Sequence, residues 1–380
     1  MAAWLFKILI VAVWLIPASA DERTQEGFAS LPSGHQIFYH YKKAQEKAPT
    51  LVLLNGLDHD TSSWQSFLDI LEPQNDEIGI LAFDMHGMGK SFLHEMMRPG
   101  LIRYDISTAI PFGEQTQDLK QLLELLKIEG DLYLLGLSYG AAIALDFMEK
   151  NPGLVKQAIL AAPYLAPLPQ QDSLIKQQIA LVRQQPSNPL NFLTDDRLYD
   201  LFLIPIVSIY PLYEPILLQE PWKIPGVYRM VQGGRLFDAL AVSKKMTPDS
   251  IHVLWAEKDE YLPRDHVINF HRQSPQNIFA SETIVTDVHH DLVRQVPNYL
   301  ASFILKVLTG SPLVNGERKI TAYPFDGYAE RGAERWEFAK DTKSLVDHLY
   351  LSKLEIFFSP ITWNLLDGSD DGCEPLLTSN

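Results

Sequence analysis

Short apolar runs alternate with segments of helical periodicity along most of the chain. The apolar runs have the length of buried strands and are TLVLLNG (50–56), IGILAFD (78–84), LYLLG (132–136), VKQAILAAP (155–163), SIHVLWAEKD (250–259) and a shorter run at 282–285. The segments between them predict helices at 62–72, capped by Ser62 or Ser63, and at 114–128, 141–150, 265–272 and 291–308. This alternation predicts an α/β fold with a mostly parallel central sheet flanked by helices.

The alternation stops between about residues 164 and 246, where no strand is predicted. The segment 201–222 within it is apolar, but prolines and Glu214 interrupt it, so it does not form a continuous membrane-spanning helix. We therefore expect a helical insertion (164–246) with its own small core, which divides the main domain into residues 21–163 and 247–309. We also expect this insertion to act as a lid whose apolar inner face lines a substrate cavity.

The two ends of the chain differ from the rest. Residues 1–20 place Lys7 before an apolar run at 8–16 and end in Ala-Ser-Ala, which is typical of a signal peptide cleaved after Ala20. An uncleaved anchor is the alternative, and cleavage predicts a secreted or periplasmic protein. Residues 310–380 form a C-terminal extension with a linker-like start, one predicted helix at 336–358 and an acidic end.

The charge and the cysteine content of the chain exclude some classes of protein. The chain has 380 residues and a formal net charge of −15, which argues against a nucleic-acid partner because such proteins present a basic face. Cys373 is the single cysteine, so no disulfide can form within the chain and packing alone must stabilise the core.

A serine between two glycines joins the apolar run at 132–136 to a predicted helix. In Gly136-Leu-Ser138-Tyr139-Gly140, the glycines allow a strand and a helix to meet at a sharp turn that exposes the serine. The helix begins at this turn, so the backbone N–H of Tyr139 can stabilise an oxyanion. This context predicts that Ser138 is a nucleophile.

A second oxyanion donor is expected from the turn after the first apolar run, where Asn55-Gly56 precedes Leu57. A nucleophilic serine also needs a base and a carboxylate that orients the base. Three acids compete at the end of the run at 250–259, and two neighbouring histidines offer a base; they are Glu257, Asp259, Glu260, His289 and His290. Asp259 is preferred because it follows the strand directly, and the chain order Ser, Asp, His is then satisfied.

With these motifs in place, residues 36–308 resemble the α/β-hydrolases of the lid-bearing, esterase- and lipase-like type. The resemblance rests on NGLDHDTSSW, DMHGMGKS, GLSYG, WAEKDEYLP and HHDLVRQVP. It implies an α/β-hydrolase fold, and it maps the family's acid onto Asp259. A proline usually lies seven residues after the family's catalytic histidine, and Pro297 lies seven after His290, which favours His290 over His289.

The resemblance has two departures. Family members usually carry His-Gly where this chain has Asn55-Gly56, a change that keeps the backbone donor but removes any contact of that histidine. The extension at 310–380 has no recognised counterpart.

Two other chemistries are disfavoured. HGMGKS resembles the end of a phosphate-binding loop, but Asp84 stands where that loop needs a glycine, so we expect a tight structural turn. No histidines show a recognised metal-ligand spacing: His266 and His271 share no helix face well, and His35 and His40 would lie on opposite faces of a strand. We expect no metal and no organic cofactor.

The sequence therefore predicts a secreted serine hydrolase that cleaves a carboxylic ester or related acyl bond of a lipophilic small molecule. Its expected triad is Ser138, His290 and Asp259. Interfacial membrane contact through the lid is a further expectation. The alternatives are carbon–carbon, lactone, thioester or amide cleavage by the same triad, or a non-catalytic binding protein with a hydrolase fold.

Overall fold

The structure is a computed structural model, and it describes residues 23–46, 48–97, 109–167, 169–209, 221–259, 261–262, 264–310 and 322–324. The predicted signal peptide, Glu260 and almost all of the predicted C-terminal extension lie outside the described residues. Among the described helices, none combines the length and the apolar character needed to cross a membrane.

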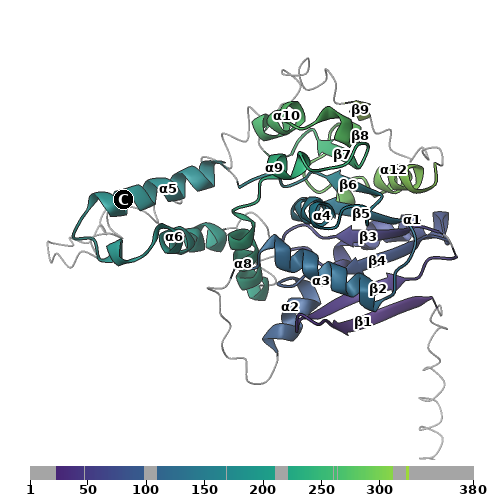
Figure 1. The fold of residues 1–380 in the computed structure, drawn as a ribbon, viewed down its shortest axis with the longest axis horizontal. Coiled ribbons are helices and arrows are strands. Elements are labelled where there is room, and N and C mark those ends of the chain that lie inside the picture. Colours follow the sequence, from purple (N-terminus) through teal and green to yellow (C-terminus); the bar gives the residue numbers. More distant parts are fainter. Residues whose placement is uncertain are drawn as a thin grey trace, which may run out of the picture.

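In the described part of the chain, nine strands form one sheet in the order β1-β2-β4-β3-β5-β6-β7-β8-β9 (Figure 1). The six strands from β4 to β8 run parallel, while β1 and β2 at one edge and β9 at the other pair antiparallel. The strands are β1 (Thr24–Ser30), β2 (Gln36–Lys42), β3 (Thr50–Leu54), β4 (Gly79–Phe83), β5 (Leu132–Leu137), β6 (Gln157–Ala161), β7 (Ile251–Ala256), β8 (Phe279–Val285) and β9 (Ala322–Pro324). This sheet confirms the predicted α/β class.

The apolar runs form the centre of the sheet because both of its faces are covered. Every residue of β3, β4 and β5 is buried. The edge strand β1 instead has the sequence TQEGFAS and buries only one side chain fully. The hydrophobic pattern does not predict β1 or β2, since edge strands carry polar residues on their open side.

Two groups of helices pack on the sheet. One group joins α1 (Gln65–Gln74) to α11 (Leu292–Gln295) and α12 (Pro297–Thr309), and the other joins α3 (Phe112–Leu125) to α4 (Tyr139–Lys150). Two further helices are α2 (Gly89–Met96) and α10 (Arg264–Gln273). In Figure 1, α3 and α4 lie in front of the sheet.

Two predicted helix boundaries are wrong. The helix expected at 62–72 begins as a 3-10 turn, η1 (Thr61–Trp64), whose cap is Asp60 rather than a serine, because the Asp60 carboxylate accepts from Ser62 N at 3.0 Å. The helix expected at 291–308 is divided at Val296 into α11 and α12, because Pro297 begins a new helix and has no N–H to continue the first one.

The described elements between β6 and β7 are helices. They are α5 (Pro169–Gln184), η2 (Pro189–Phe192), α6 (Asp195–Ile209), η4 (Pro221–Lys223), α8 (Ile224–Gly234) and α9 (Ala239–Ser243). A separate apolar cluster joins α5, α6 and α8 through side chains that include Ile175, Leu198 and Val227. In Figure 1, α5 and α6 extend away from the sheet, whereas α8 lies beside α2 and α3.

Glycines in α8 allow its backbone to touch the main domain. A Cβ added to Gly226 would overlap the carbonyl oxygen of Gly87, and one added to Gly233 would overlap that of Ile110. The Ile110 N–H also donates to the carbonyl of Arg229 at 2.9 Å. The helical insertion is therefore seated on the main domain through α8.

Replacing Gly233 by alanine should destabilise the protein. The added methyl group has to displace the Ile110 carbonyl, and overpacking of this kind typically costs about 1–3 kcal/mol. Urea unfolding of Gly233→Ala and of the wild type would measure the decrease in the free energy of unfolding. The matched control is Gly27→Ala, where the new Cβ meets nothing within 4 Å. Equal stability of the two variants would contradict the close seating of α8.

Candidate active site

Ser138 lies at the junction of β5 and α4 in a strained backbone conformation. Its φ is 52° and its ψ is −113°, which a residue with a side chain rarely adopts. Its N–H donates to the Ala161 carbonyl at 2.9 Å, and its own carbonyl accepts from Ala141 N at 3.0 Å. These bonds fix a sharp turn from strand to helix with the serine at its apex.

The two glycines beside Ser138 are required by backbone crowding. A Cβ on Gly136 would lie 2.5 Å from the backbone nitrogen of Ala141, inside the turn itself. A Cβ on Gly140 would overlap the carbonyl oxygens of Leu54 and Asn55, at the end of β3. The turn is thus a tight strand-to-helix junction, called the elbow below, and it packs directly against the end of β3.

The predicted triad residues all follow strands that run in the same direction. Ser138 follows β5, Asp259 follows β7 and His290 follows β8. Because β5, β6, β7 and β8 are parallel neighbours, these residues lie at one edge of the sheet, the carboxyl edge, where α/β proteins place their sites.

Asp259 and His290 form a fixed pair. The two atoms nearest each other are His290 Nδ1 and Asp259 Oδ2, 2.8 Å apart, and Asp259 is 3% exposed. The other carboxylate oxygen accepts from the backbone N–H groups of Tyr261 and Leu262, each at 2.9 Å. The carboxylate is thus held from both sides, and it selects the imidazole orientation in which Nε2 is directed away from Asp259.

The competing side chains are placed differently. Glu257 is buried, and its carboxylate accepts from the Asp287 N–H at 3.0 Å, which ties the end of β7 to the loop after β8. His289 is exposed, and its backbone N–H donates to Gln295 Oε1 at 3.0 Å. Asp259 therefore contacts His290, the histidine that the sequence favours.

Asn55 holds the loop that is expected to supply the second oxyanion donor. Its side chain is fully buried, donates to the Phe83 carbonyl at 3.0 Å and accepts from Trp64 Nε1 at 2.5 Å. These contacts link the end of β3 to β4 and η1. The asparagine therefore fixes the position of Gly56 and Leu57 through its own hydrogen bonds, without the histidine that the family usually has.

His59, in the same loop, was not singled out by the sequence pattern. Its side chain is 16% exposed, and burial lowers its pKa to about 4, against the opposing effect of Asp291. The imidazole is therefore neutral near pH 7, although it lies close enough to His290 to interact with it electrostatically. His59 therefore adds no positive charge beside His290.

The helical insertion contacts both the elbow and the β3 loop. The Tyr139 hydroxyl donates to the Met230 carbonyl in α8 at 3.2 Å, and burial raises the pKa of that hydroxyl. The ammonium group of Lys223, which is 4% exposed, donates to Asp60 at 3.1 Å. The insertion is thus held at two points beside the predicted oxyanion donors.

The turn containing HGMGKS is held by two glycines with positive φ and by Asp84. Gly87 and Gly89 have φ values of 89° and 50°. The buried carboxylate of Asp84 accepts from Lys90 N at 2.6 Å and from Thr61 N at 2.7 Å. Asp84 therefore stabilises the start of α2 and joins it to η1.

Comparison with known proteins agrees with this geometry. Residues 51–301 match the model of the alpha/beta hydrolase family, and the chain belongs to that family. No curated protein matches the chain by sequence.

Solved structures share the fold at low sequence identity. MGS-M2, an alpha/beta hydrolase enzyme from a Medee basin deep-sea metagenome library, is 18% identical with a TM-score of 0.52, over 77% of this chain and 100% of that one. The esterase EaEST from Exiguobacterium antarcticum is 17% identical with a TM-score of 0.50, over 75% of this chain and 99% of that one. A hydrolase from Pseudomonas aeruginosa PA01 is also 17% identical with a TM-score of 0.50, over 75% and 98% of the two chains.

Replacing Asn55 by alanine should weaken the whole loop. The change leaves the Trp64 N–H and the Phe83 carbonyl buried without their partner, at a cost of roughly 1–3 kcal/mol for each group. Denaturant unfolding, followed by tryptophan fluorescence, would measure the decrease in the free energy of unfolding. Asn75→Ala is the control, because the Asn75 side chain accepts from Glu77 N at the surface and lies outside the β3 loop. A loss no larger than in this control would show that Asn55 does not hold the loop.

Proposed function

We propose that the protein is a serine hydrolase that cleaves a carboxylic ester or a related acyl bond through Ser138, His290 and Asp259. The observation that carries this proposal is the backbone of Ser138, whose positive φ is retained at an elbow between two glycines. Strain of this kind persists where the surrounding structure enforces it, and such positions cluster at active sites. The Asp259–His290 pair at the same edge of the sheet supplies the remaining groups.

In the proposed reaction, His290 takes the proton of the Ser138 hydroxyl as the oxygen attacks the acyl carbonyl. The backbone N–H groups of Leu57 and Tyr139 then stabilise the oxyanion, each contributing about 3–4 kcal/mol. His290 returns the proton to the leaving alcohol, and water cleaves the acyl-enzyme with His290 again as base. Asp259 keeps the imidazole in the required orientation throughout.

Apolar surroundings support a lipophilic substrate. The ring of Tyr139, next to the nucleophile, contacts Phe112 with ring centroids 4.8 Å apart, and Phe112 contacts Phe237 of the helical insertion at 4.7 Å. We propose that this insertion acts as the lid and that its inner face receives the acyl group. Contact of the lid with a membrane surface, and export with cleavage after Ala20, belong to the same proposal.

Labelling with a fluorophosphonate probe tests the nucleophile. The wild-type protein should be modified at Ser138, as located by mass mapping, because only an activated serine reacts quickly. Ser138→Ala and His290→Ala should lose the label, and Asp259→Asn should slow the reaction by up to roughly 10⁴-fold. His289→Ala is the matched control and should label normally. A folded wild type without label would refute the serine hydrolase proposal.

A series of p-nitrophenyl esters tests the acyl preference. If an apolar surface receives the chain, kcat/KM should rise about fourfold for each added CH₂ until the pocket is filled, since each buried CH₂ contributes about 0.8 kcal/mol. The matched amide, thioester and lactone of the best acyl group should be cleaved more slowly. A flat series, or faster cleavage of one of these analogues, would exclude the lipophilic ester preference while leaving the triad in place.

A further inference from the structure

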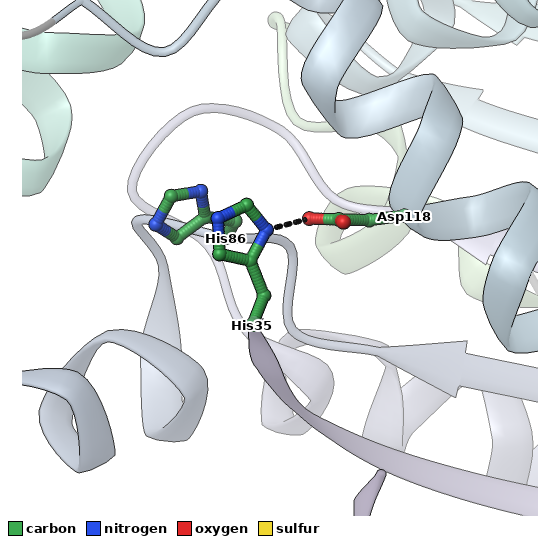
Figure 2. A group of neighbouring side chains, drawn as sticks. All are labelled: His35, His86 and Asp118. Atoms are coloured by element: carbon green, nitrogen blue, oxygen red, sulfur yellow. Dashed lines mark hydrogen bonds and ion pairs between the residues drawn. The ribbon is translucent and has the colours of Figure 1, made fainter. Parts of the chain in front are cut away.

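A compact group of histidines and carboxylates lies at the carboxyl edge of the sheet, beyond β3 and away from the elbow. His35 precedes β2, His86 follows β4, and Glu114 and Asp118 lie in α3. Donor atoms of His35, His86 and Asp118 lie within 4.8 Å of one another. Figure 2 shows the His35 ring between Asp118 and the His86 ring.

One carboxylate oxygen is shared by both imidazoles. Glu114 Oε1 lies 2.6 Å from His86 Nδ1 and 3.6 Å from His35 Nε2. Three ligand atoms around a tetrahedral zinc ion are separated by about 3.3 Å, given metal–ligand bonds of about 2.0–2.1 Å. The two distances from Glu114 Oε1 bracket this separation.

The second nitrogen of each ring is held by a different carboxylate. His35 Nδ1 lies 2.7 Å from Asp118 Oδ2, and His86 Nε2 lies 3.1 Å from Glu95 Oε2. Histidines that bind metal usually donate their other N–H to a carboxylate in this way, which fixes the tautomer and directs the free lone pair at the ion. His86 Nδ1 and His35 Nε2 are therefore the nitrogens that face Glu114.

The charges of the group also suit a cation. The carboxylates of Glu95, Glu114 and Asp118 face two stacked imidazoles whose centroids are 3.8 Å apart. Against the opposing effect of burial, the hydrogen bonds of His86 with Glu114 and Glu95 raise its pKa to about 9. Together with Arg229, which pairs with Glu95 at 3.5 Å, two positive charges therefore face three carboxylates. A divalent ion would balance the remaining negative charge and would let both imidazoles be neutral, as ligation requires.

We propose that His35, His86 and Glu114 bind a divalent transition metal, of which zinc fits the imidazole and carboxylate donors best, with Asp118 and Glu95 orienting the two histidines. The ion displaces the proton between His86 Nδ1 and Glu114. It joins the β1–β2 turn, the β4–α2 loop and α3, and it touches no residue of the proposed triad. The role is structural and does not depend on the proposed function.

Calorimetric titration of the chelator-treated protein with zinc chloride tests this site. The wild type should bind one zinc ion per chain, and its melting temperature should rise with zinc. His35→Gln and His86→Gln should abolish both effects, and Asp118→Asn should weaken binding by about 10–100-fold. His40→Gln is the matched control, because His40 also pairs with a carboxylate, Glu26 at 3.3 Å, on the same hairpin but away from the group.

Glu114→Gln tests the same site with a variant that should fold even if the histidine variants do not. The Glu114 side chain is 32% exposed, so this near-isosteric change should leave a folded chain with zinc affinity reduced by at least about tenfold. Cobalt added to the wild type should give visible absorption that Glu114→Gln lacks. No zinc uptake by the folded wild type, or equal affinity in wild type and folded Glu114→Gln, would overturn the proposal. Fluorophosphonate labelling of each variant tests the triad separately.

Discussion

The close contact between the elbow and the end of β3 is the constraint on which the site depends. At Gly140 no side chain separates the two backbones, so the first turn of α4 rests on the carbonyl oxygens of Leu54 and Asn55. The proposed nucleophile and the proposed donor Leu57 therefore belong to two segments that cannot move independently. Preorganisation of this kind matters because an oxyanion donor contributes only if it is already in place when charge develops.

The same β3 loop connects the elbow to the helical insertion. Asn55 ties the loop to β4 and η1, and Asp60, which caps η1, also pairs with the buried Lys223 of the insertion. On the other side, the hydroxyl of Tyr139 bonds to α8. A movement of the insertion would thus displace the segments on both sides of the proposed oxyanion hole. This arrangement couples the segment proposed to select the substrate with the groups proposed to carry out the reaction.

Features encoded by local spacing were predictable from the sequence, and those formed by distant residues were not. Buried parallel strands consist of continuous apolar runs, and the elbow is defined within five residues, so both could be recognised. The edge strand β1 has no apolar run, and the capping role of Asp60 depends on where the β3 loop turns. The proximity of Asp259 and His290 was expected from chain order, but their hydrogen bond depends on two loops folding against each other. His35, His86 and Glu114 come from three separate elements, so no spacing rule relates them.

A metal bound by the His35 group would act on the edge of the sheet at β1 and β2. One end of this hairpin is tied to the main domain by Arg23 and Lys42, which pair with Asp76, and by the pairing of β2 with β4 along Tyr39–Lys42. The single cysteine of the chain excludes a disulfide as a covalent link. The turn at the other end reaches the His35 group, where Ser33 and His35 both bond to Asp118 of α3. A metal ion there would replace hydrogen bonds that exchange with water by coordinate bonds joining three elements. It would hold the hairpin to α3 at the end that lacks the Asp76 pairs.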